Sequence, residues 1–149
     1  MKLHTKYFGT IEIDEKNIID FPEGIPGFEQ IKKFIVIHSE DETLPFSWLQ
    51  GVDMPELAFV IIDPRLITPN YVIDIDDSEI EVLEIKDTAK VNIYSIVVVP
   101  EELAKMTANL KAPVLINADN NKGKQVVMEK GDYPIKYYFM EQFQQKAGG

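Results

Sequence analysis

The sequence predicts an all-β, mainly antiparallel fold: a small, strongly twisted β-barrel-like single domain with one or two short peripheral helices. Most apolar segments are short, rich in Val, Ile, Tyr and Phe, and separated by turn residues, which is typical of strands. The candidate helices are too few and too short to connect parallel strands, a connection that usually takes a dozen or more residues. Prolines mark strand ends, bulges or corners, at positions 22, 45, 64, 69, 100, 113 and 134.

The chain opens with a predicted hairpin. In "LHTKY" and "TIEI", which are joined through Gly9, Ile11 and Ile13 alternate with Thr10 and Glu12, so one face is apolar and the other faces water. Further strands are predicted at residues 17–21, 33–39, 46–50, 57–63, 71–75, 91–99, 112–117, 124–129 and 134–140. This many strands would fit a sandwich or a barrel, and we favour the barrel.

Two short helices are predicted at the edge of the sheet. In "DSEIEVLEI", Ser78 is placed to cap a first helical turn, and Glu81 stands three residues further on, where it would complete a capping box. A second turn is predicted after Pro100 in "PEELAKM", because proline suits the first helical position and the two glutamates favour the positive end of a helix.

Composition indicates an ordinary globular protein. With 149 residues, of which 45% are hydrophobic and 27% charged, the chain is expected to form one domain over residues 1–143, followed by a frayed tail at 144–149. There are no cysteines, which excludes disulfides and cysteine-based metal sites. The N-terminus lacks a signal-peptide core, and the longest apolar run is far shorter than the ~18 residues of a membrane span. We expect a cytoplasmic protein that does not bind membranes.

A search for chemistry finds no recognisable catalytic, cofactor-binding or metal-binding motif. His4 and His38 each lie in a strand-like run, outside any HExxH spacing. The acidic run from Asp74 to Glu79 lacks the central glycine of a calcium loop, and its twelfth position is Ile85. We therefore expect no enzyme. The alternative is a carboxylate-based hydrolase or isomerase in the barrel mouth, which would need a pocket with convergent acids and raised pKa values.

Net charge favours basic partners. The chain carries 25 acidic and 15 basic residues, for a formal net charge of −10, and such a surface repels phosphate backbones. Direct nucleic-acid binding is therefore not expected. Two acidic clusters are candidates for the attracting field, although a solubilising surface would have the same composition; they are Glu40, Asp41 and Glu42, and Asp74, Asp76, Asp77 and Glu79.

Two further segments combine fold and recognition signals. In "FPEGIPGFE", Phe21 would either fill the core or belong to a recognition loop, and Trp48, the single tryptophan, would be a core residue or an interface anchor. In "NLKAPVLIN", residues 114–116 are predicted to be barrel core and Pro113 an edge or bulge. The residues before it, Asn109, Leu110 and Lys111, are predicted to face outward, with Asn109 either capping backbone groups or contacting a partner.

Four of these segments, in this order, resemble the FliW family of flagellar assembly factors. They are "FPEGIPGFE" (21–29), "PFSWLQGVDMPELAFVIIDP" (45–64), "TANLKAPVLIN" (107–117) and "GKQVVM" (123–128). The order and spacing extend the resemblance over nearly the whole chain, from Thr5 to about Tyr138. After "WLQ" the family commonly carries a serine where this chain has Gly51, so no hydroxyl contact is expected there.

The resemblance implies a non-enzymatic regulator with two protein partners, flagellin and the RNA-binding translational repressor CsrA. Sequestering CsrA would relieve repression of flagellin synthesis, and accumulating flagellin would release the repressor. We expect a monomer without cofactors. The candidate partner-binding residues are Phe21, Glu40, Asp41, Glu42, Trp48, Asp74, Asp76, Asp77, Glu79, Asn109, Leu110 and Lys111.

Overall fold

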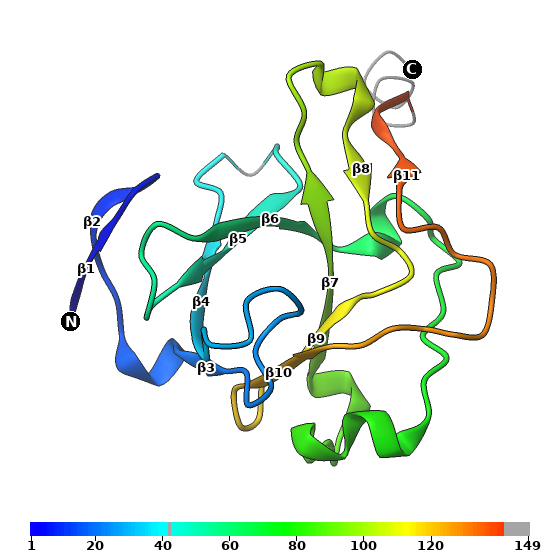
Figure 1. Cartoon of the computed structure of the whole chain (residues 1–149), viewed down its shortest axis with the longest axis horizontal. Coiled ribbons are helices and arrows are strands. Elements are labelled where there is room, and N and C mark those ends of the chain that lie inside the picture. The colour runs from blue at the N-terminus through cyan, green and yellow to red at the C-terminus, as the bar shows by residue number, and fades with distance from the viewer. Residues whose placement is uncertain (42, 142–149) are drawn as a thin grey trace.

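Seven strands close into a barrel in the computed structural model, which describes residues 1–41 and 43–141 (Figure 1). Around the barrel they follow the order β7 (Val91–Val98), β6 (Ala58–Ile62), β5 (Phe46–Gly51), β4 (Lys33–His38), β3 (Ile19–Asp20), β10 (Lys122–Gln125) and β9 (Val114–Asn117). β9 then pairs back onto β7 and closes the ring. Every pairing is antiparallel except that of β3 with β10. The predicted mainly antiparallel barrel is therefore confirmed.

One edge of β7 serves two partners in succession. Its first half pairs with β9, and its last two residues, Val97 and Val98, pair with β8 (Thr107–Ala108). β11 (Tyr137–Tyr138) adds to the outer side of β8. Between β8 and β9 the chain leaves the sheet over residues 109–113 and returns to the same edge. β7 thus joins the barrel to a short sheet that projects from its upper end (Figure 1).

The barrel interior is filled by apolar side chains, as expected for small barrels. Side chains alternate between the inner and outer faces along each strand. The interior cluster consists of Ile19, Phe21, Ile25, Phe34, Leu49, Ile61, Val114 and Ile116, all of them buried. Aromatic rings make edge contacts inside it, with the centroids of Phe21 and Phe34 separated by 5.1 Å.

Residues 21–31, here called the plug, close one end of the barrel and lie in front of it in Figure 1. Phe21 and Ile25 are buried inside, while the Phe28 ring packs against Phe59 from a more exposed position. Gly24 has φ +67°, and a Cβ there would lie 2.6 Å from backbone atoms of Glu29. The plug therefore requires glycine at this position, both for its backbone conformation and for the close approach of two chain segments.

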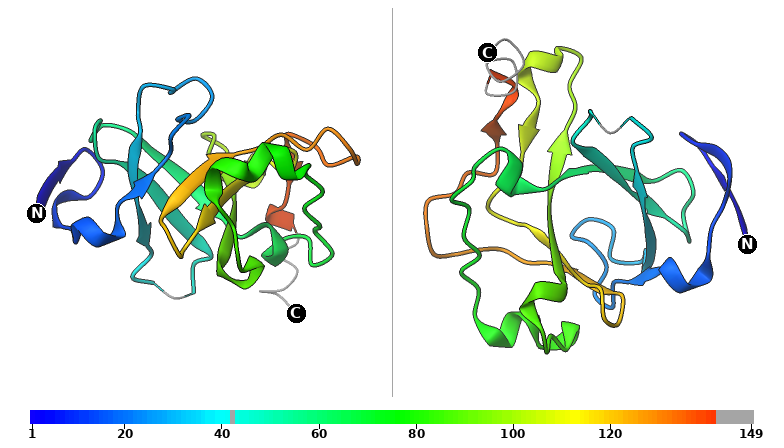
Figure 2. Two further views of the ribbon diagram at one scale, coloured as in Figure 1. Left: turned by 90° about the horizontal axis from the view of Figure 1, so that it is seen from below. Right: turned by 180° about the vertical axis from the view of Figure 1, so that it is seen from behind.

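Three further apolar clusters lie on the outside of the barrel. The opening hairpin, β1 (Lys2–Thr5) and β2 (Gly9–Glu12), packs Leu3 and, just beyond β2, Ile13 against Ile35. The long connections run on the side of the barrel away from this hairpin (Figure 2), and their side chains contribute to the other two clusters. Because these connections cover the outer faces of β6, β7 and β9, those strands are apolar on both faces.

The predicted helices are present as short 3₁₀ helices. The first is η3 (Asp77–Leu83), whose N-cap is Asp76 without a side-chain capping bond. The predicted cap at Ser78 is therefore wrong, because Ser78 lies inside the helix. The second is η5 (Leu103–Lys105), which begins later than predicted after Pro100. The other 3₁₀ turns are η1 (Glu15–Asn17), η2 (Pro64–Leu66) and η4 (Thr88–Lys90).

The strand predictions are wrong in several places. The strand predicted at 17–21 is reduced to the two residues of β3, and the one predicted at 124–129 corresponds to β10, which already ends at Gln125. Residues 71–75 form no strand in the described structure, because this segment covers the outer apolar clusters with Ile73 and Ile75 instead of joining a ladder. The segment 134–140 contributes only the two residues of β11. β8 was not predicted, since it has only two residues. The frayed tail predicted at 144–149 lies outside the described residues.

Candidate functional site

The second acidic cluster forms one wall of a groove. Asp74, Asp76, Asp77 and Glu79 are all exposed, and residues 125–130 form the opposite wall. The groove has a volume of about 320 Å³. We call it the acidic groove; it is lined by Asp74, Ile75, Asp76, Glu79, Gln125, Val126, Val127, Glu129 and Lys130.

Alternation along the chain directs the carboxylates into the groove. Ile73 and Ile75 pack against the buried cluster of Leu83, Leu115 and Val126, whereas the acidic residues between and beside them are exposed. The backbone N–H of Asp74 donates to the Sδ of Met128 at 3.4 Å, which holds the two walls together. The apolar positions thus anchor the segment, and the acidic positions face solvent.

The groove keeps an excess of negative charge. Its lining includes four carboxylates, from residues 74, 76, 79 and 129, and a single lysine, Lys130, whose Nζ lies 4.0 Å from Asp76. At its end Lys124 forms ion pairs with Glu23 at 3.1 Å and Glu79 at 3.8 Å. The Lys130–Asp76 pair is exposed on both sides and contributes little stability, whereas the Lys124 side chain is mostly buried. The surplus carboxylates remain available to a cationic partner.

The segment 109–113 lies next to the acidic groove. The Asn109 Oδ1 accepts hydrogen bonds from the backbone N–H groups of Lys111 and Ala112, at 3.1 and 3.0 Å. The Lys111 carbonyl in turn accepts from Met128 N–H at 2.8 Å. Asn109 and Lys111 are half-buried. The outward orientation predicted for Leu110 is wrong, since its exposed fraction is 1%. The segment 109–113 leaves the sheet and places Leu110 in the outer cluster with Tyr71 and Phe139.

The first acidic cluster lies elsewhere, in the turn between β4 and β5. Glu40 and Asp41 are exposed there, and Glu42 lies outside the described residues. The Thr43 hydroxyl and N–H donate to Asp41 and hold the pKa of that carboxyl below its usual value. The structure therefore does not bring the two acidic clusters together (Figures 1 and 2).

The two aromatic candidates have different environments. Trp48 is half-buried on β5, where its ring contacts Phe8 of the hairpin loop with centroids 5.4 Å apart. It lies on the surface between barrel and hairpin. Phe21 is fully buried in the barrel interior, so the interpretation of a core-filling residue applies and a direct partner contact by its side chain is excluded.

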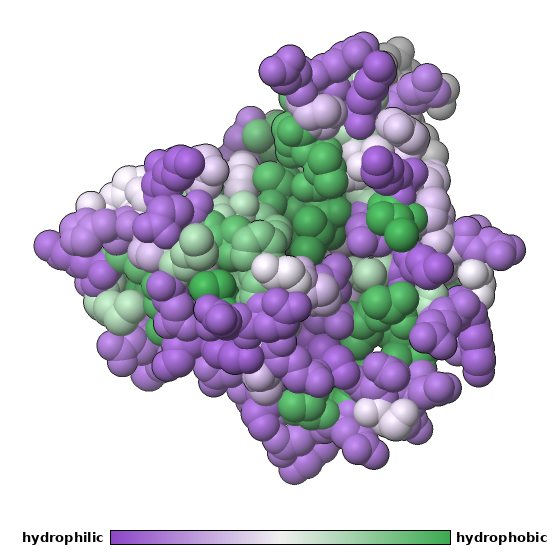
Figure 3. Space-filling view, viewed as in Figure 1, coloured by the Kyte–Doolittle hydropathy of each residue, from purple (hydrophilic) through white to green (hydrophobic). Residues whose placement is uncertain are grey.

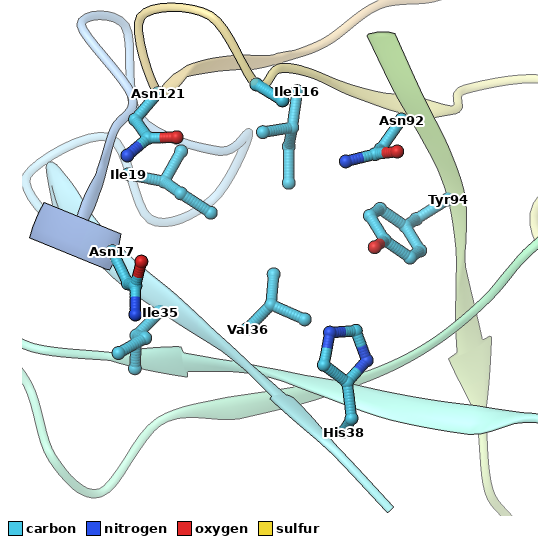
Figure 4. Close-up of a pocket in the computed structure, with 10 residues that line it drawn as sticks. Asn17, Ile19, Ile35, Val36, His38, Asn92, Tyr94, Ile116 and Asn121 are labelled. Atoms are coloured by element: carbon cyan, nitrogen blue, oxygen red, sulfur yellow. The ribbon is translucent and has the colours of Figure 1, made fainter. Parts of the chain in front are cut away.

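A pocket of about 320 Å³ opens at the barrel mouth, the region lined by Asn17, Ile19, Ile35, Val36, His38, Asn92, Tyr94, Ile116, Ala118 and Asn121 (Figure 4). Ile19, Val36 and Ile116 are among its apolar lining residues, and the amides of three asparagines and the His38 imidazole are among the polar ones. The His38 Nδ1 lies 3.1 Å from the Ser47 Oγ. Burial raises the pKa of the Tyr94 hydroxyl, which therefore stays protonated.

This mouth does not have the chemistry that the hydrolase alternative requires. The described lining residues include no carboxylate, and no described group of three or more His, Cys, Asp or Glu side chains is placed to hold a metal ion. The carboxyl groups with shifted pKa values, Glu29, Asp41 and Glu84, are shifted downward by hydrogen bonds that favour the charged form. Such carboxylates are poor general acids at neutral pH.

Apolar side chains also gather on the surface over the upper part of β7 (Figure 3). Val98 and Val99 are 59% and 48% exposed, and Val98, Thr107 and Tyr138 lie side by side across β7, β8 and β11. We call Val98, Val99, Leu103 and Tyr138 the apolar end. Contiguous exposed apolar residues of this kind often mark interaction surfaces.

Sequence reasoning missed the second wall of the acidic groove. Val127 and Glu129 belong to "KQVVME", which was assigned to a strand without a role. The available signal was the glutamate and lysine that immediately follow the apolar pair, because charged residues at the end of a strand often face a neighbouring loop. The partner loop, 50 residues earlier in the sequence, could not be inferred from that signal.

The closed, plugged barrel with its charge clusters on the outer wall defines a small β-barrel domain with a surface-exposed candidate site. The chain belongs to the FliW family: residues 2–139 match the family described as "FliW protein". It is 49% identical over 142 residues to the flagellar assembly factor FliW of Thermoanaerobacter pseudethanolicus, with 95% of both chains covered. The corresponding protein of Caldanaerobacter subterraneus subsp. tengcongensis is 46% identical, again over 95% of both chains.

The fold matches as well. The crystal structure of a flagellar assembly factor FliW superimposes with a TM-score of 0.86 at 42% sequence identity, covering 93% of this chain and 96% of the other. The resemblance seen in the sequence segments is therefore confirmed over nearly the whole chain. Among the described residues, no helix has the length and apolar character needed to cross a membrane.

Proposed function

We propose that this chain is a non-enzymatic, cytoplasmic regulator of flagellar assembly that binds CsrA and flagellin in a partner-switching circuit and acts as a monomer. The observation that carries the proposal is the family match over residues 2–139, since the relatives are named flagellar assembly factors. The barrel mouth without carboxylates among its described lining residues supports the non-enzymatic part of the proposal.

The acidic groove supplies a mechanism for antagonising an RNA-binding protein. A repressor that binds RNA presents a basic surface to phosphates, and four carboxylates in one groove attract that surface. Once bound, a chain of net charge −10 repels RNA nearby, so it need not occupy the RNA site itself. We assign CsrA to the acidic groove on this argument.

A second surface is available for flagellin. The apolar end is separate from the groove, and its side chains are exposed without being needed inside the barrel. Partner switching would then follow from coupling between the two surfaces through β7, β9 and the segment 109–113, which connects them. We assign flagellin to the apolar end.

Calorimetric titration with CsrA, with flagellin, and with each in the presence of the other tests the proposal. Asp74→Asn combined with Asp76→Asn should weaken CsrA binding by about tenfold, and should reduce its dependence on salt. Glu40→Gln combined with Asp41→Asn removes the same charge from the other side of the barrel and should leave CsrA affinity nearly unchanged. Val98→Ser should weaken flagellin binding alone.

Two outcomes would contradict the proposal at different levels. If neither protein binds at low salt, the regulatory function is wrong for this chain. If both bind but the two charge-neutralised pairs weaken CsrA equally, the function stands and the assignment of CsrA to the acidic groove is wrong.

A further inference from the structure

One wall of the acidic groove has a free backbone edge. The N–H groups of Val126 and Met128 donate to the carbonyls of Pro113 and Lys111, at 3.0 and 2.8 Å. This is the two-residue spacing of an antiparallel ladder, and it continues the β9–β10 pairing beyond Gln125. In such a ladder the N–H and C=O of the residue in between point to the opposite edge. For Val127 that edge continues the edge of β10 on which β3 pairs at Lys122.

No part of the described chain pairs with this opposite edge at Val127. β3 meets β10 only at Asp20 and Lys122, and the backbone groups of Val127 form no hydrogen bond within residues 1–41 and 43–141. The Val127 side chain is 52% exposed. An unpaired donor, an unpaired acceptor and an exposed β-branched side chain together form a template for another strand.

The surroundings of this edge select the chemistry of an added strand. The groove beside it has apolar surface from Ile75 and Val127 and carboxylates from Asp74, Asp76 and Glu129. A second copy of this chain is disfavoured as the added strand, since it would bring a like net charge of −10 and the same acidic walls. A segment that alternates apolar residues with lysine or arginine would fit both the floor and the walls.

We propose that the edge at residues 125–129 binds an extended, lysine- or arginine-bearing segment of a partner protein as an added β-strand. Backbone hydrogen bonds to Val127 supply the affinity, and the carboxylates of the groove select for basic side chains. This inference deepens the proposed function by naming the binding mode at the groove, and it rests on that function only for the identity of the partner.

A synthetic probe tests the binding mode without either protein partner. The probe is a capped peptide alternating valine and lysine over about eight residues, a usual strand length. In ¹⁵N-resolved NMR titrations, the largest shifts are expected at residues 125–129, and the Val127 amide should become protected from hydrogen exchange. A peptide with glutamate in place of lysine should not bind. The lysine peptide should also fail to bind when every backbone nitrogen is methylated, because its N–H donors are then lost while its charge is kept.

Val127→Pro is the matched change in the protein. It removes the outward N–H without breaking an internal bond, and it should weaken probe binding by at least about tenfold. Val127→Thr keeps the N–H and should bind the probe nearly as well as the parent chain. Circular dichroism should show both variants folded; if the proline variant unfolds, the N-methylated peptide decides alone.

The proposal is overturned if the N-methylated and unmodified lysine peptides bind equally, because the attraction is then charge alone. It is also overturned if the probe binds without protecting Val127, or if it does not bind at low salt. None of these outcomes bears on whether CsrA or flagellin binds elsewhere, so failure of the binding mode and failure of the proposed function give different results.

Discussion

Tyr71 joins two distant parts of the chain through a single hydroxyl. Its O–H donates to the Leu110 carbonyl at 2.6 Å, and its ring packs against Tyr133 at a tilt of 49°, with centroids 4.6 Å apart. The side chain is buried, and burial raises the pKa of its phenol well above the usual value. This bond satisfies a carbonyl in the segment 109–113 that has left the sheet, where ladder partners are missing.

Replacing Tyr71 by phenylalanine should therefore destabilise the protein. The ring is kept, but the buried Leu110 carbonyl loses its donor, a change that costs about 1–3 kcal/mol. Urea unfolding followed by circular dichroism measures the loss. Tyr133→Phe, which removes a hydroxyl that bonds the more exposed Val72 N–H, serves as the control and should cost less. Equal losses in both variants would contradict the role given to Tyr71.

The same phenol predicts how stability depends on alkaline pH. Because the pKa of Tyr71 is higher in the folded than in the unfolded protein, the folded state holds its proton more tightly. The stabilisation is fully present below the unfolded value of about 10, and it is lost as the pH rises above that value. The free energy of unfolding should fall less steeply above pH 10 in Tyr71→Phe than in the parent protein. Identical slopes would show that Tyr71 does not titrate with unfolding.

Two glycines with similar φ angles allow two costs of a Gly→Ala substitution to be measured separately: backbone strain and steric overlap with neighbouring atoms. Gly9 has φ +65° with open space around a built Cβ, whereas Gly24 has φ +67° with Glu29 backbone atoms 2.6 Å from the same position. Gly9→Ala should cost about 1–2 kcal/mol from its left-handed conformation alone. Gly24→Ala should cost clearly more, since the plug must move. Thermal unfolding of both variants checks this, and equal costs would contradict the close approach.

At the level of secondary-structure elements, the segment 109–113 forms an excursion out of the sheet between β8 and β9. It allows both strands to pair with the same edge of β7. Asn109 begins the excursion, with its N–H bonded to the Ile96 carbonyl and its side chain bonded to the N–H groups of Lys111 and Ala112. The side chain thereby replaces two ladder partners with a local turn. Of the two roles open from the sequence, capping of backbone groups agrees with these bonds.

Asn109→Ala should lower stability by about 0.5–1.5 kcal/mol, the usual net contribution of a hydrogen bond, and the loss should be accompanied by faster amide exchange at residues 111 and 112. Asn92→Ala is a suitable control, because Asn92 lies exposed on β7 and its side chain forms no hydrogen bond with the described residues. Partner affinity decides the remaining question: if it falls in Asn109→Ala with exchange unchanged, the residue is a contact and not a cap.

Sequence patterns predicted strand positions correctly where the local sequence of a strand is enough to determine them. The opening hairpin and the strands at 33–38, 46–51, 58–62 and 91–98 follow from β-branched runs between turn residues, and the structure places them within a residue or two. The run 114–116 was also correctly assigned to a strand, but the prediction put Leu115 inside the barrel. Its side chain packs outside, against Leu83 and Val126, because both faces of β9 are covered.

The patterns failed where distant segments decide the outcome. Residues 71–75 have strand-like composition, yet they join no ladder, and Ile73 and Ile75 instead pack against the outer apolar clusters. Leu110 looked exposed in the sequence, next to a lysine and an asparagine, and only the excursion of the chain beneath Tyr71 buries it. Of the candidate site, the acidic wall was visible in the sequence, and the facing wall with its free edge was not.

For the whole molecule, the excess of negative charge destabilises the folded state. The described ion pairs are largely exposed and contribute little individually, whereas a net charge of −10 repels itself in the folded state. The described residues of both acidic clusters are exposed, so added salt screens them effectively. Self-repulsion is therefore expected to outweigh the attraction within the ion pairs.

Raising monovalent salt from about 0.01 to about 0.1 M shortens the screening length from ~30 to ~10 Å and should raise Tm by about 2–4 °C. Differential scanning calorimetry measures the shift. Near the sequence pI of about 4.6 the net charge is small, and the same salt step should have little effect. A decrease in Tm with salt at neutral pH would show that attractive pairs dominate.

The single parallel contact between Asp20 and Lys122 determines when the molecule can finish folding. The strand that begins the barrel and the strand that completes it are separated by most of the chain, and closure of so long a loop carries a large entropic cost. During synthesis, the strand edges that pair with β9 and β10 stay unpaired until those two strands have left the ribosome. For cells that make this protein, the vulnerable interval for aggregation or proteolysis therefore falls late in translation.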